Sequence, residues 1–256
     1  MLELLEEEMR CIEFLHYEKT DVSLCACIEG KMGRAWVDNK EKPIIAIVVV
    51  ADICYLLGNI TSNNVKFTLD ELLEKCSGKV IVTYDNSWIS IIESLDSNRL
   101  RRFSRYSTKK ELDVFEESLL NSYINKIGSE FYINRIDESL YFKVLEDDFM
   151  ADCCSNYSSV EEFLKNGLGY AIVHNGEIIS AASSYSYCEG SIDITIGTKY
   201  EYRRKGLAIA VASKLILDCI EKNIYPRWDA ANLQSVALAT KLGYNFDKEY
   251  EVFSII

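Results

Sequence analysis

Apolar and polar residues alternate with two different periods along the chain, and the period changes from one segment to the next. In segments such as 43–57 and 178–187, apolar residues recur at every second position or in short runs, which is typical of β-strands. In segments such as 86–95 and 207–222 they recur at every third or fourth position, which predicts amphipathic helices. This mixture of short strands and helices predicts an α+β protein.

The first part of the chain, residues 1–127, is predicted to form a smaller α/β domain. Residues 2–17 combine apolar and acidic residues at roughly helical spacing. Further helices are expected at 68–76, with Thr68 as N-cap and Glu71 at N3, and at 86–95 and 112–127; strands are expected at 23–29, 34–38, 43–57 and 79–84. Gly128-Ser129 favours a turn, which we take as the boundary.

The second part, residues 128–256, is predicted to form a mixed, mainly antiparallel sheet flanked by helices. Strands are expected at 131–136, 168–173, 178–187, 190–198, 227–230 and 250–255, with helical segments at 140–144, 149–150, 160–164, 207–222 and 232–242. Asn175-Gly176 lies between two apolar runs and predicts a β-hairpin.

Composition limits the classes of function. Hydrophobic residues make up 48% and charged residues 27% of the 256 residues, as in soluble globular proteins. No apolar run reaches the roughly 18 residues needed to span a bilayer. Because the first eight residues are acidic where a secretory signal would be basic, we expect a cytoplasmic protein without a membrane partner.

Charge and cysteine content exclude further classes. The net charge of −12 counts against nucleic acid as a partner and would suit a cationic amine, although acidity can also serve solubility alone. The nine cysteines are odd in number and lack a C-x-x-C pair, so most are expected to be small core residues. With two histidines in the chain, no metal site is expected.

Residues 203–208, which we call the anion-binding loop, connect a predicted strand to a predicted helix. Backbone N–H groups at the start of a helix lack partners and, together with the helix dipole, attract anions. Gly206 has no β-carbon to block a diphosphate, and Arg203, Arg204 and Lys205 add positive charge. The sequence therefore predicts a phosphate site here.

Two motifs in this half resemble a known family. Arg203-x-x-Gly206-x-Ala208 is similar to the pyrophosphate-loop motif of the GNAT superfamily of acetyl-CoA-dependent N-acetyltransferases. Asn232-x-x-Ser235, followed by Gly243-Tyr244, is similar to its second motif. The segment from Trp228 to Tyr244 most resembles a branch, the "GNAT acetyltransferase" proteins, that includes antibiotic-resistance enzymes of the zwittermicin type. The resemblance covers roughly the last half of the chain.

The resemblance implies a set of acetyl-CoA-binding residues. Ile196 and Thr198 would pair with the pantetheine amides, and Gly197 would allow a bulge that parts this strand from its neighbour. Asn232 would hold the cofactor arm or act only as a helix N-cap, and Ser235 would help or only support that turn. The implied set is Ile196, Gly197, Thr198, Arg203, Arg204, Lys205, Gly206, Leu207, Ala208, Asn232 and Ser235, with Lys241 a weaker candidate.

The chemistry implied is attack of a neutral amine on a thioester, which needs a base for the amine and an acid for the thiolate. Asp193 on the strand before the loop is the candidate base, or else an exposed strand residue; Glu189 is a lesser candidate. Many relatives carry a tyrosine as the acid where this chain has Ala239. Tyr244 or a water could substitute, or the thiolate could leave unaided.

We therefore expect acetyl transfer to the primary amine of a small molecule, by direct attack in a ternary complex, in a monomer or homodimer. The alternative is an acyl-CoA-binding or sensing protein with little or no turnover. The basic segment 100–106, which has interleaved aromatic residues, is expected to be a solvated strand or linker face. A helper site for the adenosine phosphate of the cofactor is the alternative.

Overall fold

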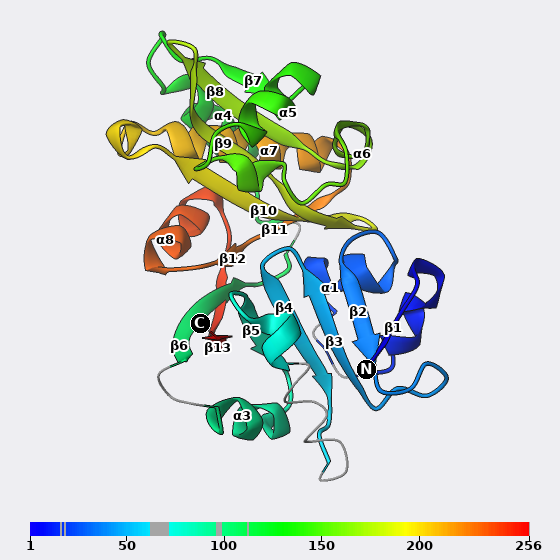
Figure 1. The fold of residues 1–256 in the computed structure, drawn as a ribbon. Coiled ribbons are helices and arrows are strands. Elements are labelled where there is room, and N and C mark those ends of the chain that lie inside the picture. Colours follow the sequence, from blue (N-terminus) through cyan, green and yellow to red (C-terminus); the bar gives the residue numbers. More distant parts are fainter. Residues whose placement is uncertain (16, 18, 62–71, 96–98, 112, 256) are drawn as a thin grey trace. The chain divides into compact units, whose positions relative to one another are not determined.

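A computed structural model describes all residues except 16, 18, 62–71, 96–98, 112 and 256. The chain divides into two compact units, Met1–Arg105 with Glu249–Ile256, and Tyr106–Lys248 (Figure 1). Two long strands, β6 (Leu100–Thr108) and β13 (Phe246–Ile255), contribute residues to both units. Both units combine strands with flanking helices, which confirms the α+β class.

The first unit is built on one mixed sheet with strand order β1-β2-β3-β4-β5-β13-β6. The strands not yet given are β1 (Leu2–Glu3), β2 (Arg34–Val37), β3 (Ile45–Val50), β4 (Ile53–Gly58) and β5 (Val80–Thr83). Helix α3 (Asn86–Glu93) packs Trp88 and Ile92 against Ile81 and Phe253 of the sheet. Helix α1 (Val22–Ile28) adds a second buried segment.

Two predictions for this unit were wrong. The segment 23–29 is helix α1 and not a strand, because the side chain of Asp21 accepts the N–H of Leu24 and caps the helix. The helix predicted at 2–17 is a two-residue strand followed by the 3-10 helix η1 (Glu6–Ile12). The helix contains buried Met9 and Ile12 but is only seven residues long.

Other predictions for this unit were confirmed or refined. The long β segment at 43–57 is a hairpin, β3 and β4, whose turn places Ala51 at φ 51°. Strands at 34–38 and 79–84 and a helix at 86–95 are present. Of the helix predicted at 68–76, residues 72–76 are helical, and Thr68 and Glu71 lie outside the described residues.

The second unit contains a five-stranded sheet with the order β11-β10-β9-β8-β7. Its strands are β7 (Ile133–Arg135), β8 (Gly169–His174), β9 (Glu177–Cys188), β10 (Ser191–Thr198) and β11 (Tyr225–Arg227); β12 (Asp229–Ala230) pairs instead with the end of β6. The β8–β9 hairpin turns at Asn175 and Gly176, both at positive φ, as predicted.

Helices cover this sheet. The long helix α7 (Leu207–Glu221) packs Leu207, Val211 and Leu215 against β8, β9 and β10. The others are α4 (Glu117–Asn125), α5 (Glu138–Leu145), α6 (Val160–Asn166), α8 (Leu233–Leu242) and the 3-10 helices η2 (Ala151–Cys153) and η3 (Tyr200–Tyr202). The helix predicted over 112–127 is shorter, since α4 begins at Glu117.

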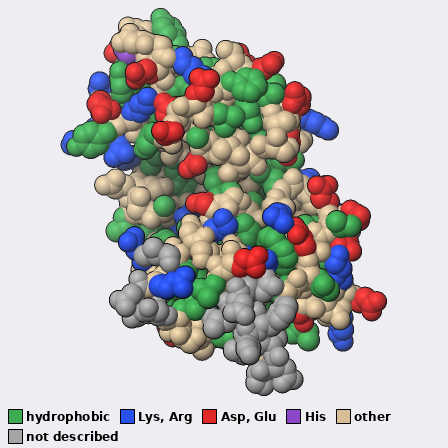
Figure 2. Space-filling view, in the orientation of Figure 1, with side chains coloured by type: hydrophobic (Ala, Val, Ile, Leu, Met, Phe, Trp, Pro, Cys, Tyr) green, Lys and Arg blue, Asp and Glu red, His purple; other side chains and the backbone are tan. Residues whose placement is uncertain are grey.

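Most cysteines are buried side chains, as expected, but two are bonded. Cys54 and Cys76 form a disulfide in the first unit, and the other seven cysteines are free. On the face in Figure 2, acidic and basic side chains are interspersed.

Candidate functional site: a loop, a pocket and an open strand edge

The anion-binding loop joins η3 to helix α7, and its conformation depends on Gly206. Gly206 is the N-cap of α7 with φ 81°, a left-handed conformation that side chains with a β-carbon rarely adopt. A β-carbon added there would meet nothing within 4 Å, so the residue faces open space. Glycine is required by the backbone and also leaves the space in front of the loop free.

The main-chain N–H groups from Arg204 to Ile209 are not bonded to any acceptor among the described residues. The first helical bond of this turn is donated by Ala210 to the carbonyl oxygen of Gly206, and no side chain caps the helix. A run of unpaired donors at the positive end of a 15-residue helix is a strong anion-binding feature. The predicted arrangement of amides is thus present.

These amides border a pocket of about 410 Å³. It is lined by Thr198, Tyr202, Arg203, Arg204, Gly206, Leu207, Ala208, Ile209, Leu238 and Lys241. Its volume lies within the roughly 300–1,000 Å³ of small-molecule sites. The pocket is therefore formed by the anion-binding loop, the end of β10 and one side of α8.

The cations around this pocket differ in how they are held. Arg203 donates from Nε to the carbonyl oxygen of Thr198 at 3.2 Å and lies over the ring of Tyr200. The amine of Lys205 lies 4.9 Å from the ring centroid of Tyr202. The exposed Arg204 has no ion pair within the described part of the chain. Among the three cations of the anion-binding loop, Arg204 is therefore the most available to a ligand.

Strand β10 has an open edge beside the loop. It pairs with β11 only from Ser191 to Asp193, whereas its pairing with β9 continues to Thr198. The chain that follows β11 forms β12, which pairs with β6 instead of β10. As a result, no partner strand among the described residues lies along Ile194–Thr198 on this edge.

The backbone of Ile196 and Thr198 is directed to that edge. Lys199 donates its N–H to Ile179 on β9, and the carbonyl oxygen of Gly197 accepts from the Ser180 hydroxyl. Because backbone polar groups alternate in direction along a strand, those of residues 196 and 198 point away from β9. Pairing of both residues with an amide-bearing ligand stays a prediction, and the carbonyl oxygen of Thr198 already accepts from Arg203.

The bulge expected at Gly197 lies elsewhere. The irregularity in the β9–β10 pairing falls between Asp193 and Ile194. A β-carbon at Gly197 would meet the sulfur of Met150 at 3.1 Å and the ring of Phe149 at 3.3 Å. Glycine at this position therefore allows the segment after α5 to approach β10 closely. The parting of β10 from β11 does not arise from a bulge at Gly197.

Asn232 and Ser235 form the start of helix α8. The side-chain oxygen of Asn232 accepts the N–H of Ser235 at 2.9 Å, so Asn232 is a helix N-cap. The hydroxyl of Ser235 accepts from the indole N–H of Trp228 at 3.0 Å. Neither residue lines the pocket. Asn232 is an exposed residue, and a role for both residues in cofactor binding stays a prediction.

The candidate base, Asp193, lies where β10 and β11 part. Its carboxylate pairs with Nη1 of Arg227 at 2.9 Å and accepts from the hydroxyl of Ser186 at 3.3 Å. Arg227 also contacts Asp229 at 3.4 Å, and all three charged side chains are mostly buried. Asp193 would have to leave this ion pair to take a proton from a substrate.

The candidate acid, Tyr244, lies in the core of the second unit. Its hydroxyl donates to the carbonyl oxygen of Pro226 at 2.6 Å. Burial raises the pKa of Tyr244 well above its usual value. Ala239 is buried beside Tyr244 and Trp228, so the position where relatives carry a tyrosine is part of this packing. The acid role of Tyr244 stays a prediction.

Sequence reasoning did not name three residues of the pocket. Tyr202, Ile209 and Leu238 line it together with the predicted residues. Ile209 could have been found, because it belongs to the same first helical turn as Ala208. Leu238 gave no signal, since the sequence does not show which side of α8 faces α7.

Comparisons with known proteins agree with this geometry. A family model described as GNAT acetyltransferase matches residues 13–253, and the chain therefore belongs to the GNAT acetyltransferase family. The Uncharacterized N-acetyltransferase YdfB of Bacillus subtilis (strain 168) is 26% identical over 187 residues, covering 72% of this chain and 69% of that protein.

Two solved structures extend the comparison. A GCN5-related N-acetyltransferase-like protein from Streptococcus suis 89/1591 is 32% identical, with a TM-score of 0.88, over 99% of this chain and 100% of that one. A tandem GNAT protein from the clavulanic acid biosynthesis pathway is 9% identical, with a TM-score of 0.58, over 99% of this chain and 97% of that one. The second likeness is one of fold alone.

No group of three or more His, Cys, Asp or Glu side chains among the described residues could hold a metal ion. None of the helices described is both long enough and apolar enough to cross a membrane.

Proposed function

We propose that this member of the GNAT acetyltransferase family transfers the acetyl group of acetyl-CoA to the primary amine of a small molecule, by direct attack in a ternary complex. The observation that carries the proposal is the run of unbonded amides from Arg204 to Ile209 at a pocket beside the open edge of β10. A diphosphate and an amide-bearing arm are the chemical groups that these two features would bind.

Under this proposal each part of the site has one task. The anion-binding loop takes the pyrophosphate through its amides, with Arg204 adding charge. Ile196 and Thr198 hold the pantetheine arm through their backbone groups. The acceptor nitrogen attacks the thioester carbonyl carbon, a C–N bond forms, the C–S bond breaks, the nitrogen loses a proton and the thiolate gains one.

Two residues are candidates for proton transfer. Asp193 is the candidate base and Tyr244 the candidate acid. Both have strong protein partners, Arg227 and the Pro226 carbonyl. The contacts favour a structural role for each, which leaves water as the carrier of both protons.

The chemical class of the acceptor is inferred from the net charge of the chain. Because the chain carries 40 acidic against 28 basic residues, its field favours a cationic amine over an anionic acceptor. The proposal further includes a cytoplasmic location, a monomer or homodimer, and acceptors such as the amine antibiotics of the branch that the sequence resembles.

A second candidate, an acyl-CoA-binding protein with little turnover, is favoured by one observation. Ala239 replaces the acid of many relatives and lies within the core. Both candidates predict binding of acetyl-CoA, and they differ in turnover.

The experiment measures binding of acetyl-CoA by calorimetry and release of free CoA thiol in the presence of a panel of primary amines. Binding together with amine-dependent thiol release is expected. Binding without release for every amine would favour the second candidate. Absence of binding would refute both.

A further inference from the structure

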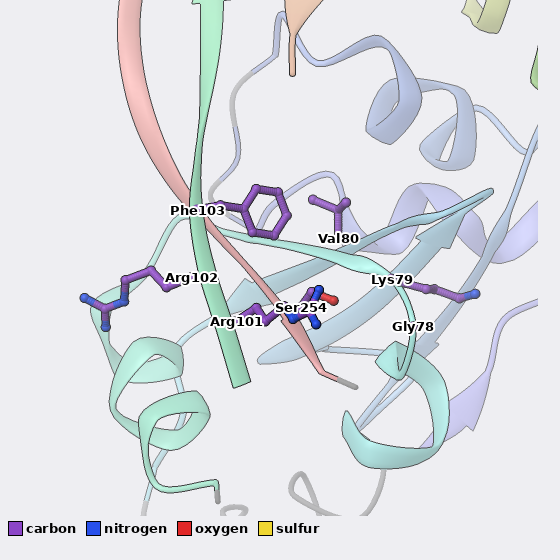
Figure 3. Close-up of a pocket in the computed structure, with 7 residues that line it drawn as sticks. All are labelled: Gly78, Lys79, Val80, Arg101, Arg102, Phe103 and Ser254. Carbon is purple, nitrogen blue, oxygen red and sulfur yellow. The ribbon is translucent and has the colours of Figure 1, made fainter. Parts of the chain in front are cut away.

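A second pocket lies in the first unit, on three adjacent strands. It has a volume of about 550 Å³ (Figure 3). Its lining residues come from β5, β6 and β13 and from the turn before β5: Gly78, Lys79, Val80, Arg101, Arg102, Phe103 and Ser254. None of them belongs to the pocket beside the anion-binding loop.

Four of these residues form a common surface. Val80 and Ser254 are register partners on β5 and β13. Arg101 and Phe103 lie two positions apart on β6 and therefore share a face. In Figure 3 the ring of Phe103 lies opposite Val80, and Arg101 lies beside Ser254. The surface thus has an apolar part and a polar, cationic part.

Arg102 has a different environment. Its side chain points away from the other lining residues in Figure 3. Its guanidinium pairs with Glu93 and with Glu251 and lies 5.2 Å from the ring centroid of Phe253. The charge of Arg102 is therefore already compensated by the protein.

Arg101 and Lys79 lack such compensation. Arg101 is exposed and Lys79 partly exposed, and neither makes an ion pair with a described residue. Among the described residues no carboxylate lines the pocket, in a chain with 12 more acidic than basic residues. Two cations without a counterion beside a pocket of ligand size favour an anionic ligand.

We propose that this pocket binds a small anion, a phosphate or carboxylate group carried on a flat ring. The guanidinium of Arg101 and the hydroxyl of Ser254 bind the anionic group, because an arginine side chain matches the geometry of both anions. Phe103, with 38% of its surface exposed, packs against the ring together with Val80. Lys79 adds charge at the rim. The site does not depend on the proposed acetyl transfer.

The test is calorimetric titration of the full chain with phenyl phosphate, benzoate and inorganic phosphate. At least one ring-bearing anion is expected to bind more tightly than inorganic phosphate, and the tighter of the two identifies the anionic group. Arg101→Gln is expected to weaken that binding at least tenfold, and Lys79→Gln a few-fold. Phe103→Ala should remove the advantage over inorganic phosphate.

Two controls keep the test specific. Arg10→Gln and Lys42→Gln each remove an exposed cation of the same unit that does not line the pocket. Both should bind the ligand as the parent chain does, and circular dichroism verifies folding. Equal losses in the controls, or no binding of either ring-bearing anion, would overturn the proposal. Displacement of the bound ligand by saturating acetyl-CoA would also overturn it.

Discussion

At the scale of single residues, Gly206 combines a backbone requirement with a free space in front of it. Its φ of 81° costs a residue with a β-carbon about 1 kcal/mol, and Gly206 lines the pocket with nothing within 4 Å of an added β-carbon. Gly206→Ala is therefore expected to weaken acetyl-CoA binding at least tenfold, measured by calorimetry, and to lower stability by about 1 kcal/mol.

A matched control separates these two effects. Gly176, in the β8–β9 turn, has φ 83° and likewise nothing within 4 Å of an added β-carbon. Gly176→Ala carries the same backbone strain away from the pocket. It should lose the same stability and keep the acetyl-CoA affinity. Equal acetyl-CoA affinities for both variants would show that acetyl-CoA does not occupy the space in front of Gly206.

Tyr244 permits a prediction on pH. Burial raises its pKa well above the usual value of about 10, so the folded state keeps the proton that the unfolded chain loses. The stabilisation is fully present below about pH 10 and is lost as the pH rises further. Unfolding in urea should show a steeper fall of stability above pH 10 in the parent chain than in Tyr244→Phe.

The same variant tests the acid role. Tyr244→Phe removes the hydrogen bond to Pro226, which costs about 1 kcal/mol at neutral pH. Because that hydroxyl proton is engaged, we expect kcat to change by only a few-fold. A loss of kcat by two orders of magnitude in a variant that is still folded at the assay temperature would instead identify Tyr244 as the proton donor.

At the scale of elements, the site depends on where β10 and β11 part. Arg227 stands at the last paired position, opposite Asp193, and contacts Asp229 at the start of β12. The guanidinium therefore links the two parting strands. A buried cation between two carboxylates is costly to remove, because both carboxylates lose their ion pair with Arg227.

A pair of variants tests this link. Arg227→Gln is expected to lower stability by about 3 kcal/mol, and Asp193→Asn by less, because Arg227 retains Asp229. If the pair is structural, kcat of Asp193→Asn stays within tenfold of the parent value. Denaturant unfolding measures the stability, and thiol-release kinetics measure kcat. A hundredfold loss of kcat confined to Asp193→Asn would establish it as the base.

The elements that could be predicted are those that local chemistry determines. Asn175-Gly176 predicted the hairpin because both residues tolerate positive φ. The loop before α7 was predicted because Gly206 and the helical apolar pattern lie together. Residues 23–29 could not be assigned correctly, since short buried apolar segments have the same composition in a strand and in a helix.

At the scale of the whole molecule, the association of distant segments lay beyond sequence reasoning. β13 pairs through Phe253 and Ser254 with β5 of the first unit. Nothing local in residues 249–256 indicates a partner more than 160 positions earlier. The open edge of β10 was expected from the family resemblance alone, because it depends on β12 pairing with β6.

The predicted domain boundary between residues 127 and 128 can be tested with fragments of the whole molecule. Helix α4 packs against α7, with Leu120 fully buried in the cluster that includes Ala212, Ile216 and Tyr244. A fragment that starts at residue 128 lacks this helix, so its core has lost a large apolar surface. A fragment of residues 106–248 keeps this helix.

We expect fragment 106–248 to fold and bind acetyl-CoA, and fragment 128–256 to do neither, as measured by circular dichroism and calorimetry. Acetyl-CoA binding by fragment 128–256 would favour the predicted boundary, because it would show that α4 is dispensable for the pocket.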